Sequence, residues 1–132
     1  MIIANQKVSA HLLYREVRCK GHECCDGGHI RWEVLELFER IRARCSYVMG
    51  RDVPIHINSG VRCQVHNIMV GGAKGSQHLK GLALDLAAPS IIGREEFDKI
   101  CESVVGDRGG VGFYDWGNHI DARGELARWE GK

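Results

Sequence analysis

The chain has no long apolar run and almost no net charge, and both absences limit the partners it can have. Its 132 residues include 18 Lys and Arg and 17 Asp and Glu, which gives a formal net charge of +1. This balance gives no electrostatic reason to expect nucleic acid or an anionic membrane as a partner. No apolar stretch approaches the length of a membrane span, and the N-terminus lacks the basic start and apolar core of a signal peptide. We therefore expect a cytoplasmic protein that binds neither nucleic acid nor membrane.

Proline, repeats and linkers are scarce as well. The only prolines are Pro54 and Pro89, and each bounds a predicted element. No internal repeat or low-complexity segment interrupts a composition that is 44% hydrophobic and 27% charged. These values are those of an ordinary globular protein, and the length favours one domain. We expect a single domain over residues 1–132 and a monomer.

Hydrophobic periodicity predicts most of the elements. Apolar residues recur at spacings of three and four from Arg31 to Met49, which indicates a long helix that Gly50 ends. Further expected elements are a helix at Arg94–Val105, a helical turn at Gln64–Val70, a Ser9-capped helix to about Val17, and strands at Pro54–Asn58, Leu82–Ala87, Val111–Tyr114 and Asn118–Ala122. The pattern predicts an α+β fold, in which helices pack on one side of a small antiparallel sheet and a site occupies the open face.

Two imidazoles and a carboxylate stand out in two separate segments. His78 precedes the strand that carries Asp85, and His119 lies on a later strand. Strand alternation puts His119 and Asp121 on one face. Singly, each residue is most simply a hydrogen-bonded structural side chain. Together they form a common ligand set for catalytic zinc, which leaves one position for water.

The residues around these ligands resemble a known motif. The run Ser-x-His-x-x-Gly-x-Ala-x-Asp ending at Asp85, followed by His-x-Asp ending at Asp121, resembles the zinc peptidases of the D-alanyl-D-alanine carboxypeptidase family, peptidase family M15. The segment around Arg62 resembles that family's Ser-Gly-x-Arg-Cys segment. The resemblance runs from about Ser9 to Trp129. It implies a fold like that of the hedgehog and D-Ala-D-Ala peptidase domains, with one catalytic zinc.

Within this family, the chain resembles the short variant of the domain that is associated with phages and prophages, where such domains cut peptidoglycan peptides. Without a signal peptide, such a protein would stay in the cytoplasm until release and then act on the cell wall. The bond cut would be D-Ala-D-Ala, by carboxypeptidase action, or one between L-Ala and D-Glu, by endopeptidase action. The sequence does not decide between them.

The resemblance also suggests residues that contact the substrate. It implies that Arg62 points into the cleft and holds a substrate oxygen or the developing oxyanion, work for which a fixed guanidinium is suited. It implies that Ser76 hydrogen-bonds the substrate, although a turn hydroxyl bonded to local backbone is the simpler alternative. Tyr114 and Trp116 are predicted to line the cleft, or else to cap the core.

The general base departs from the family pattern. Several relatives carry Glu or Asp three residues before the last ligand histidine, and others carry a His two before it, where this chain has Trp116 and Gly117. Asp115 is the nearest acid and is our predicted base. Asp121, on the same face as His119, is the competing candidate for the base; otherwise it is predicted to support catalysis by orienting that ligand. The departure leaves open an alternative function, a catalytically weak or inactive zinc module that binds cell wall or a phage particle, much as hedgehog domains bind partners.

Six cysteines are many for this length. Cys19, Cys24 and Cys25, with His22 and His29 nearby, have the density of a second, structural zinc site, but their spacing fits no standard zinc finger. Reduced thiols and disulfides formed after release are equal alternatives. The remaining predictions are that Cys45 and Cys101 are core residues and that Trp129 is a packing residue.

Overall fold

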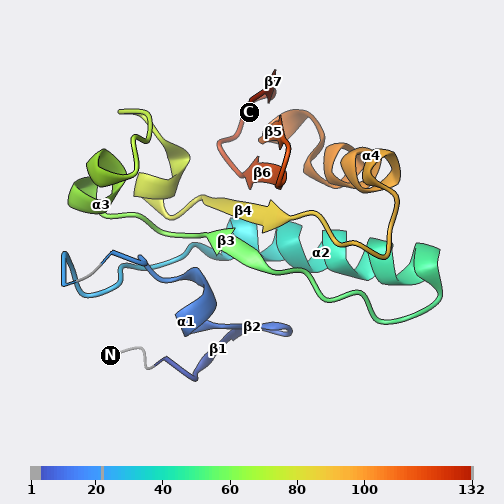
Figure 1. The fold of residues 1–132 in the computed structure, drawn as a ribbon, viewed down its shortest axis with the longest axis horizontal. Helices are drawn as coiled ribbons and strands as arrows, with labels where there is room; N and C mark the ends of the chain where they lie inside the picture. Colours follow the sequence, from blue (N-terminus) through green and yellow to red (C-terminus); the bar gives the residue numbers. More distant parts are fainter. Residues whose placement is uncertain (1–3, 22, 132) are drawn as a thin grey trace.

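The computed structural model describes residues 4–21 and 23–131 and confirms the α+β class. Figure 1 shows the arrangement of its elements. In chain order they are β1 (Lys7–Ser9), β2 (Leu12–Leu13), α1 (Tyr14–Val17), α2 (Trp32–Met49), β3 (Ile57–Ser59), α3 (Gln64–Met69), the 3-10 helix η1 (Gln77–Lys80), β4 (Ala83–Ala87), α4 (Arg94–Val105), the 3-10 helix η2 (Gly106–Arg108), β5 (Gly110–Tyr114), β6 (Gly117–Asp121) and β7 (Ala127–Glu130).

The central sheet has five strands in the order β3-β4-β6-β5-β7. Its pairs are antiparallel except β5 and β7, which run parallel at one edge. In the register between β4 and β6, Asp85 lies opposite His119 and Ala83 lies opposite Asp121. Because side chains on directly opposed positions share a face of the sheet, this register brings the predicted ligands together.

The other face of the sheet carries the core. Leu84, Leu86 and Ile120 alternate with the site residues along β4 and β6 and are fully buried. They join one cluster with Phe38 of α2 and Phe97 of α4. Figure 1 shows α2 running along β3 and β4, and α4 beside β5 and β6. The helices therefore cover one face, as the sequence predicted, and the opposite face is left for the site.

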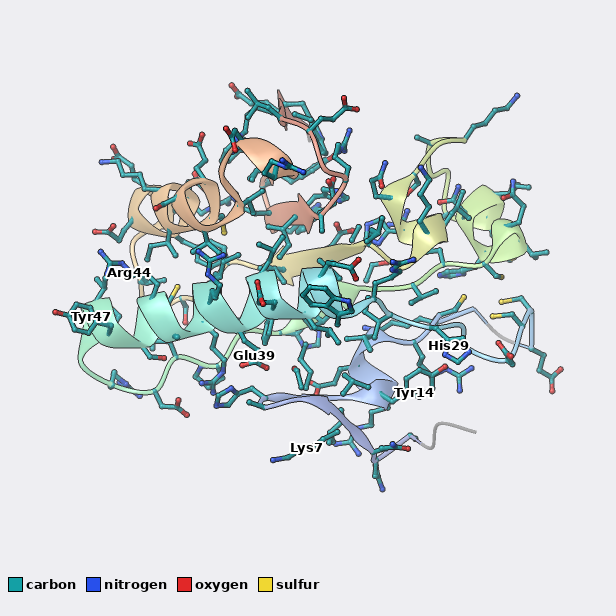
Figure 2. The ribbon with its side chains drawn as sticks, turned by 180° about the vertical axis from the view of Figure 1, so that it is seen from behind. Lys7, Tyr14, His29, Glu39, Arg44 and Tyr47 are labelled. Carbon is teal, nitrogen blue, oxygen red and sulfur yellow. The ribbon has the colours of Figure 1, made fainter. Side chains whose placement is uncertain are left out.

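The N-terminal part differs from the prediction. Ser9 does not cap a helix but ends β1, and its hydroxyl donates a 2.6 Å hydrogen bond to Glu39 of α2. The helix that follows is the single turn α1; its N-cap residue is Leu13, whose backbone N–H donates to the Glu16 side chain over 2.7 Å. Figure 2 shows Glu39 on the side of α2 that faces β1 and β2. A carboxylate from another element thus takes the hydroxyl that was expected to bond local backbone.

The strands are shorter or more numerous than expected. The strand predicted at Pro54–Asn58 instead runs over Ile57–Ser59, although Ile55 and Ile57 are both buried as their spacing indicated. Strands β1, β2 and β7 were not predicted. Among the described residues, no helix has both the length and the apolar character that crossing a bilayer requires.

Candidate metal centre and catalytic cleft

Three predicted ligands meet on the open face of the sheet. Asp85 comes from β4, His119 from β6, and His78 from η1, the helical turn just before β4. Asp85 Oδ1 lies 3.0 Å from His78 Nε2 and 3.0 Å from His119 Nδ1. All three side chains are buried, with relative exposures of 2% for His78, 7% for Asp85 and 8% for His119. The structure therefore assembles the ligand set that the sequence predicted.

In each imidazole, the outer ring nitrogen, which points away from Asp85, already has a hydrogen-bond partner. These partners show whether the inner nitrogens, which face Asp85, are free to bind a cation. His78 Nδ1 lies 2.6 Å from the carbonyl oxygen of Gly60, and His119 Nε2 lies 2.7 Å from Asp121 Oδ2. Each of these oxygens can only accept, so the outer nitrogens carry the protons and the inner nitrogens present lone pairs. Two lone pairs and a carboxylate oxygen then face one another, an arrangement that a cation or a shared proton must stabilise. The donor set fits zinc, which binds neutral imidazole and ionised carboxylate.

Arg62 secures the second oxygen of the carboxylate ligand. Its Nη2 lies 3.4 Å from Asp85 Oδ2, while its other nitrogens donate to Ser59 and to Asn67. Burial tends to raise the pKa of Asp85, but when the shared proton sits on the imidazole pair, hydrogen bonds and positive charge from the two rings outweigh it and hold this pKa below its usual range. The carboxylate is therefore ionised, as a metal ligand must be.

Asp121 is placed to orient His119. It is fully buried, and Arg123 donates two hydrogen bonds to its carboxylate, from Nε to Oδ1 over 2.9 Å and from Nη2 to Oδ2 over 2.8 Å. The backbone N–H of Gly110 also donates to it at 3.0 Å. Burial alone would raise the pKa of Asp121, but Arg123 and His119 hold it well below its ordinary range. An ionised carboxylate bonded to the outer nitrogen fixes the orientation and tautomer of a ligand histidine.

A cavity of about 560 Å³ opens beside the three ligands. Tyr114 and Trp116 stack on one another along it, with ring centroids 4.8 Å apart and planes 14° apart. Trp129 donates from its indole nitrogen to the Tyr114 hydroxyl over 2.8 Å and continues this aromatic wall towards His119. Beyond the ligands, the side chains that line the cavity include Arg62, Ser76, Tyr114, Trp116, Arg123 and Trp129.

Ser76 has a local partner as well as a place in the cavity. Its hydroxyl accepts a 3.2 Å hydrogen bond from the backbone N–H of His78 and so caps η1. This is the turn contact that the sequence offered as the simpler alternative. The hydroxyl also lies among the residues that line the cavity, where its hydrogen is free to point at a ligand.

Asp115 does not lie among the residues that line the cavity. It is exposed in the two-residue turn between β5 and β6. Arg94 ties this turn to α4 by donating to the carbonyl oxygens of Tyr114 at 2.6 Å, Gly117 at 2.8 Å and Asp115 at 3.2 Å. These hydrogen bonds hold the turn in place, away from the ligands. The role of Asp115 as base stays a prediction that its position does not support.

Sequence reasoning missed Arg123, and it gave Trp129 a packing role without its place along the cavity. Arg123 could have been found, because it continues the alternation of His119 and Asp121. Trp129 gave no such signal, since β7 is a short edge strand. Its indole lies against β5 at Gly112, where an added Cβ would come within 2.6 Å of the ring. Glycine at this position is what lets the tryptophan reach the neighbourhood of His119.

Comparison with known proteins agrees with the geometry. A family model described as Peptidase M15 matches residues 10–121, most of the chain, including the three ligands and Arg62. No curated protein matches the chain. The extent of the family match supports a zinc metallopeptidase of this general kind. The resemblance seen in the sequence is therefore confirmed, and the chain belongs to peptidase family M15.

Proposed function

We propose that this protein is a zinc-dependent peptidase that hydrolyses an amide bond in bacterial peptidoglycan stem peptides. The observation that carries the proposal is the convergence of His78, Asp85 and His119 at the wall of an open cavity. Three protein ligands beside solvent-accessible space are typical of catalytic zinc sites, whereas structural sites are closed by a fourth protein ligand. Bound zinc would polarise the scissile carbonyl and acidify a water molecule.

The charges around the cavity favour an anionic peptide. Arg62 and Arg123 both line it, and among the described residues Asp85, a ligand itself, is the only acid that does so. Stem peptides offer carboxylates at D-Ala ends and on D-Glu, which a guanidinium can bind with two parallel hydrogen bonds. Ser76, Tyr114 and Trp116 supply the remaining contacts: a hydroxyl and two flat faces for the small side chains of the peptide.

In the reaction, Arg62 acts on the oxygen of the scissile carbonyl. Its guanidinium is mostly buried, with 15% of the side chain exposed, and contacts with Ser59, Asn67 and Asp85 fix its position. A positive charge fixed before the reaction stabilises a developing oxyanion without reorganisation. Asp121 keeps the Nδ1 lone pair of His119 directed at the metal position.

We retain Asp115 as the proposed base because among the acids of the β5–β6 hairpin it is the one with an unbound, exposed carboxylate. Asp121 cannot take this role, since both its oxygens are occupied by His119, Arg123 and backbone N–H groups. For Asp115 to act, the turn would have to release at least part of its contact with Arg94.

One observation favours a second function, a zinc-containing module that binds wall peptides without cutting them. Among the described residues, no carboxylate other than the ligand Asp85 lines the cavity. A cleft without a base could still hold a stem peptide through its two arginines. The protein would then bind the same partner, but turnover would be slow or absent.

Defined muropeptides distinguish the two functions and name the bond. The purified protein is incubated with each muropeptide with and without a chelator, and the products are identified by mass. We expect loss of a terminal D-Ala or cleavage between L-Ala and D-Glu, and no product with chelator or in His78→Ala. If the zinc-loaded protein binds the muropeptides but cleaves none, the binding function replaces the peptidase.

The same assay tests the base. Asp115→Ala should lower the rate at least 100-fold, the usual range for a general base, while zinc content is unchanged. Asp107→Ala is the matched control, because it also removes an exposed carboxylate, from η2 and outside the cavity. If Asp115→Ala turns over as fast as Asp107→Ala, the assignment of Asp115 is wrong.

The setting of this activity is also a proposal. We infer that the protein acts as a monomer on the cell wall after release from the cytoplasm, as phage and prophage lytic enzymes do. Sedimentation of the purified protein tests the first part, since a stable dimer at working concentration would contradict it.

A further inference from the structure

A second group of metal-binding side chains lies away from the catalytic cleft. The sulfur atoms of four cysteines, Cys19, Cys24, Cys25 and Cys63, all lie within 4.8 Å of one another. Figure 2 shows sulfur atoms gathered in the loop beyond His29, at one end of the molecule. The sequence had indicated a site from the first three, with His22 and His29 nearby. The fourth member, Cys63, comes from the segment after β3, and spacing along the chain gave no reason to join it to the others.

The distances between these sulfur atoms match the size of a metal–thiolate tetrahedron. Cys24 Sγ lies 3.2 Å from Cys63 Sγ and 3.8 Å from Cys19 Sγ. Four sulfurs about 2.3 Å from a zinc ion form a tetrahedron with edges of about 3.8 Å. We propose that Cys19, Cys24, Cys25 and Cys63 hold a structural zinc ion with four thiolate ligands. The histidines of the same segment are not needed: His29 is exposed and outside the group, and His22 falls outside the described residues.

The backbone around the cluster is arranged to favour thiolates. Backbone N–H groups point at three of the sulfurs: Gly27 at Cys25 over 3.3 Å, Cys63 at Cys19 over 3.4 Å, and His66 at Cys63 over 3.4 Å. Such donors stabilise negative charge on a ligand sulfur and fix its direction.

Glycine at position 21 also fits a closed site. A Cβ there would lie 2.3 Å from Cys24 Sγ and 3.0 Å from the His66 ring, so only glycine allows the loop to fold this tightly over the sulfur. Residues 18–31, which carry three of the four cysteines, contain no helix or strand where they are described. A loop of this length gains its fixed shape from a cross-link more readily than from a core.

The proposed ion would fasten this loop to the segment that orients the catalytic ligands. Cys63 directly follows Arg62, whose backbone N–H donates to the carbonyl of His78 over 3.0 Å. Three residues before Cys63, the carbonyl of Gly60 accepts from His78 Nδ1. On the other side of the cluster, the Val17 carbonyl accepts from Val61 N–H over 2.8 Å. The thiolate site thus secures the backbone that sets His78 and Arg62, but it does not depend on the peptidase proposal.

Cobalt substitution tests the proposal on the wild-type protein. Tetrahedral cobalt with several thiolate ligands has an intense thiolate-to-metal charge-transfer band, which a site of two imidazoles and a carboxylate lacks. We expect this band in the reduced, cobalt-loaded wild type and in His78→Ala, and its loss in Cys63→Ala. Zinc content should be two per chain in the wild type and one in either variant. Cys45→Ala, which removes a buried thiol outside the cluster, should keep both zincs and the band.

Other results would overturn it. The thiolate site is absent if the wild-type protein gives no charge-transfer band. It is also absent if the wild type holds a single zinc ion that is kept in Cys63→Ala and lost in His78→Ala. Disulfides would replace the zinc site if two results are found together. The protein purified without reductant would have a mass below that of the reduced chain by pairs of hydrogens, and reduction would not restore zinc binding. Cys25→Ala serves if Cys63→Ala does not fold, because Cys25 is exposed and its loss should still halve the zinc content.

Discussion

Replacement of Asp121 by asparagine should weaken zinc binding at the His78 site while leaving the fold in place. Asp121 Oδ2 accepts from His119 Nε2 over 2.7 Å, and Asp121 Oδ1 accepts from Gly110 N–H and from Arg123. Every partner is a donor. An asparagine has one acceptor oxygen, so its amide N–H₂ must face either the imidazole or the guanidinium, and a donor then opposes a donor.

The magnitude follows from the role of the lost contact. Removing the group that orients a ligand histidine typically costs 10- to 100-fold in metal affinity, or about 1.4 to 2.7 kcal/mol. Stability should also fall, because Arg123 loses its partner. We expect about 2 kcal/mol, below the range for a fully buried pair, because a quarter of the Arg123 side chain is exposed.

Chelator competition measures the affinity, and thermal unfolding measures the stability. The site is identified as the one that His78→Ala removes. Arg123→Gln is the matched control, because it breaks the same ion pair but leaves the bond between Asp121 and His119 intact. It should lose similar stability and much less than tenfold in affinity. If Asp121→Asn binds zinc at this site as tightly as the wild type, the orienting role is refuted.

Three further changes test the fold and its pH dependence. Arg94→Ala removes the hydrogen bonds to three carbonyls of the β5–β6 turn and should cost about 2 kcal/mol in urea unfolding; an unchanged midpoint would show that the turn holds itself. Phe97→Ala empties a fully buried position and should cost about 3 to 5 kcal/mol, and a cost below about 1 kcal/mol would contradict its place in the core. Burial tends to raise the pKa of Glu39, but hydrogen bonds from Ser9 and His11 outweigh it and lower this pKa. A carboxyl whose pKa is lowered by folding stabilises the fold at pH values above its ordinary pKa of about 4.5, and this stabilisation is lost as the pH falls through the pKa of the folded state. Glu39→Gln should therefore lower the free energy of unfolding by about 1 kcal/mol at pH 7 and by little near pH 2. A loss of stability that does not depend on pH would refute the assignment.

The parts of the fold that repeat a pattern over many residues could be predicted from the sequence. The long helix and the helix Arg94–Val105 were found because each shows apolar spacings of three and four over several turns. The strands that carry Asp85 and His119 were found to within about a residue, since alternation and flanking glycines bound them. The metal ligands were identified from the motif that resembles the family, and His78 lies on neither of these strands but in η1.

What failed depends on contacts between segments far apart in the chain. Ser9 could not be read correctly, because Glu39 of α2 is 30 residues away. Strand β7 exists because β5 offers it an edge, and its four residues are too few to show a period. For the same reason Trp129 was not connected to the cleft. Cys63 was assigned to the arginine motif, and only the folded chain brings it to the other cysteines.

The most direct test of the central claim is anomalous diffraction at the zinc absorption edge from crystals of the zinc-loaded protein. The account predicts a zinc ion bound by His78 Nε2, Asp85 Oδ1 and His119 Nδ1, with its remaining position turned to the cavity and held by no protein atom. A map with no zinc between these three atoms, or with a fourth protein ligand closing the ion, would contradict it.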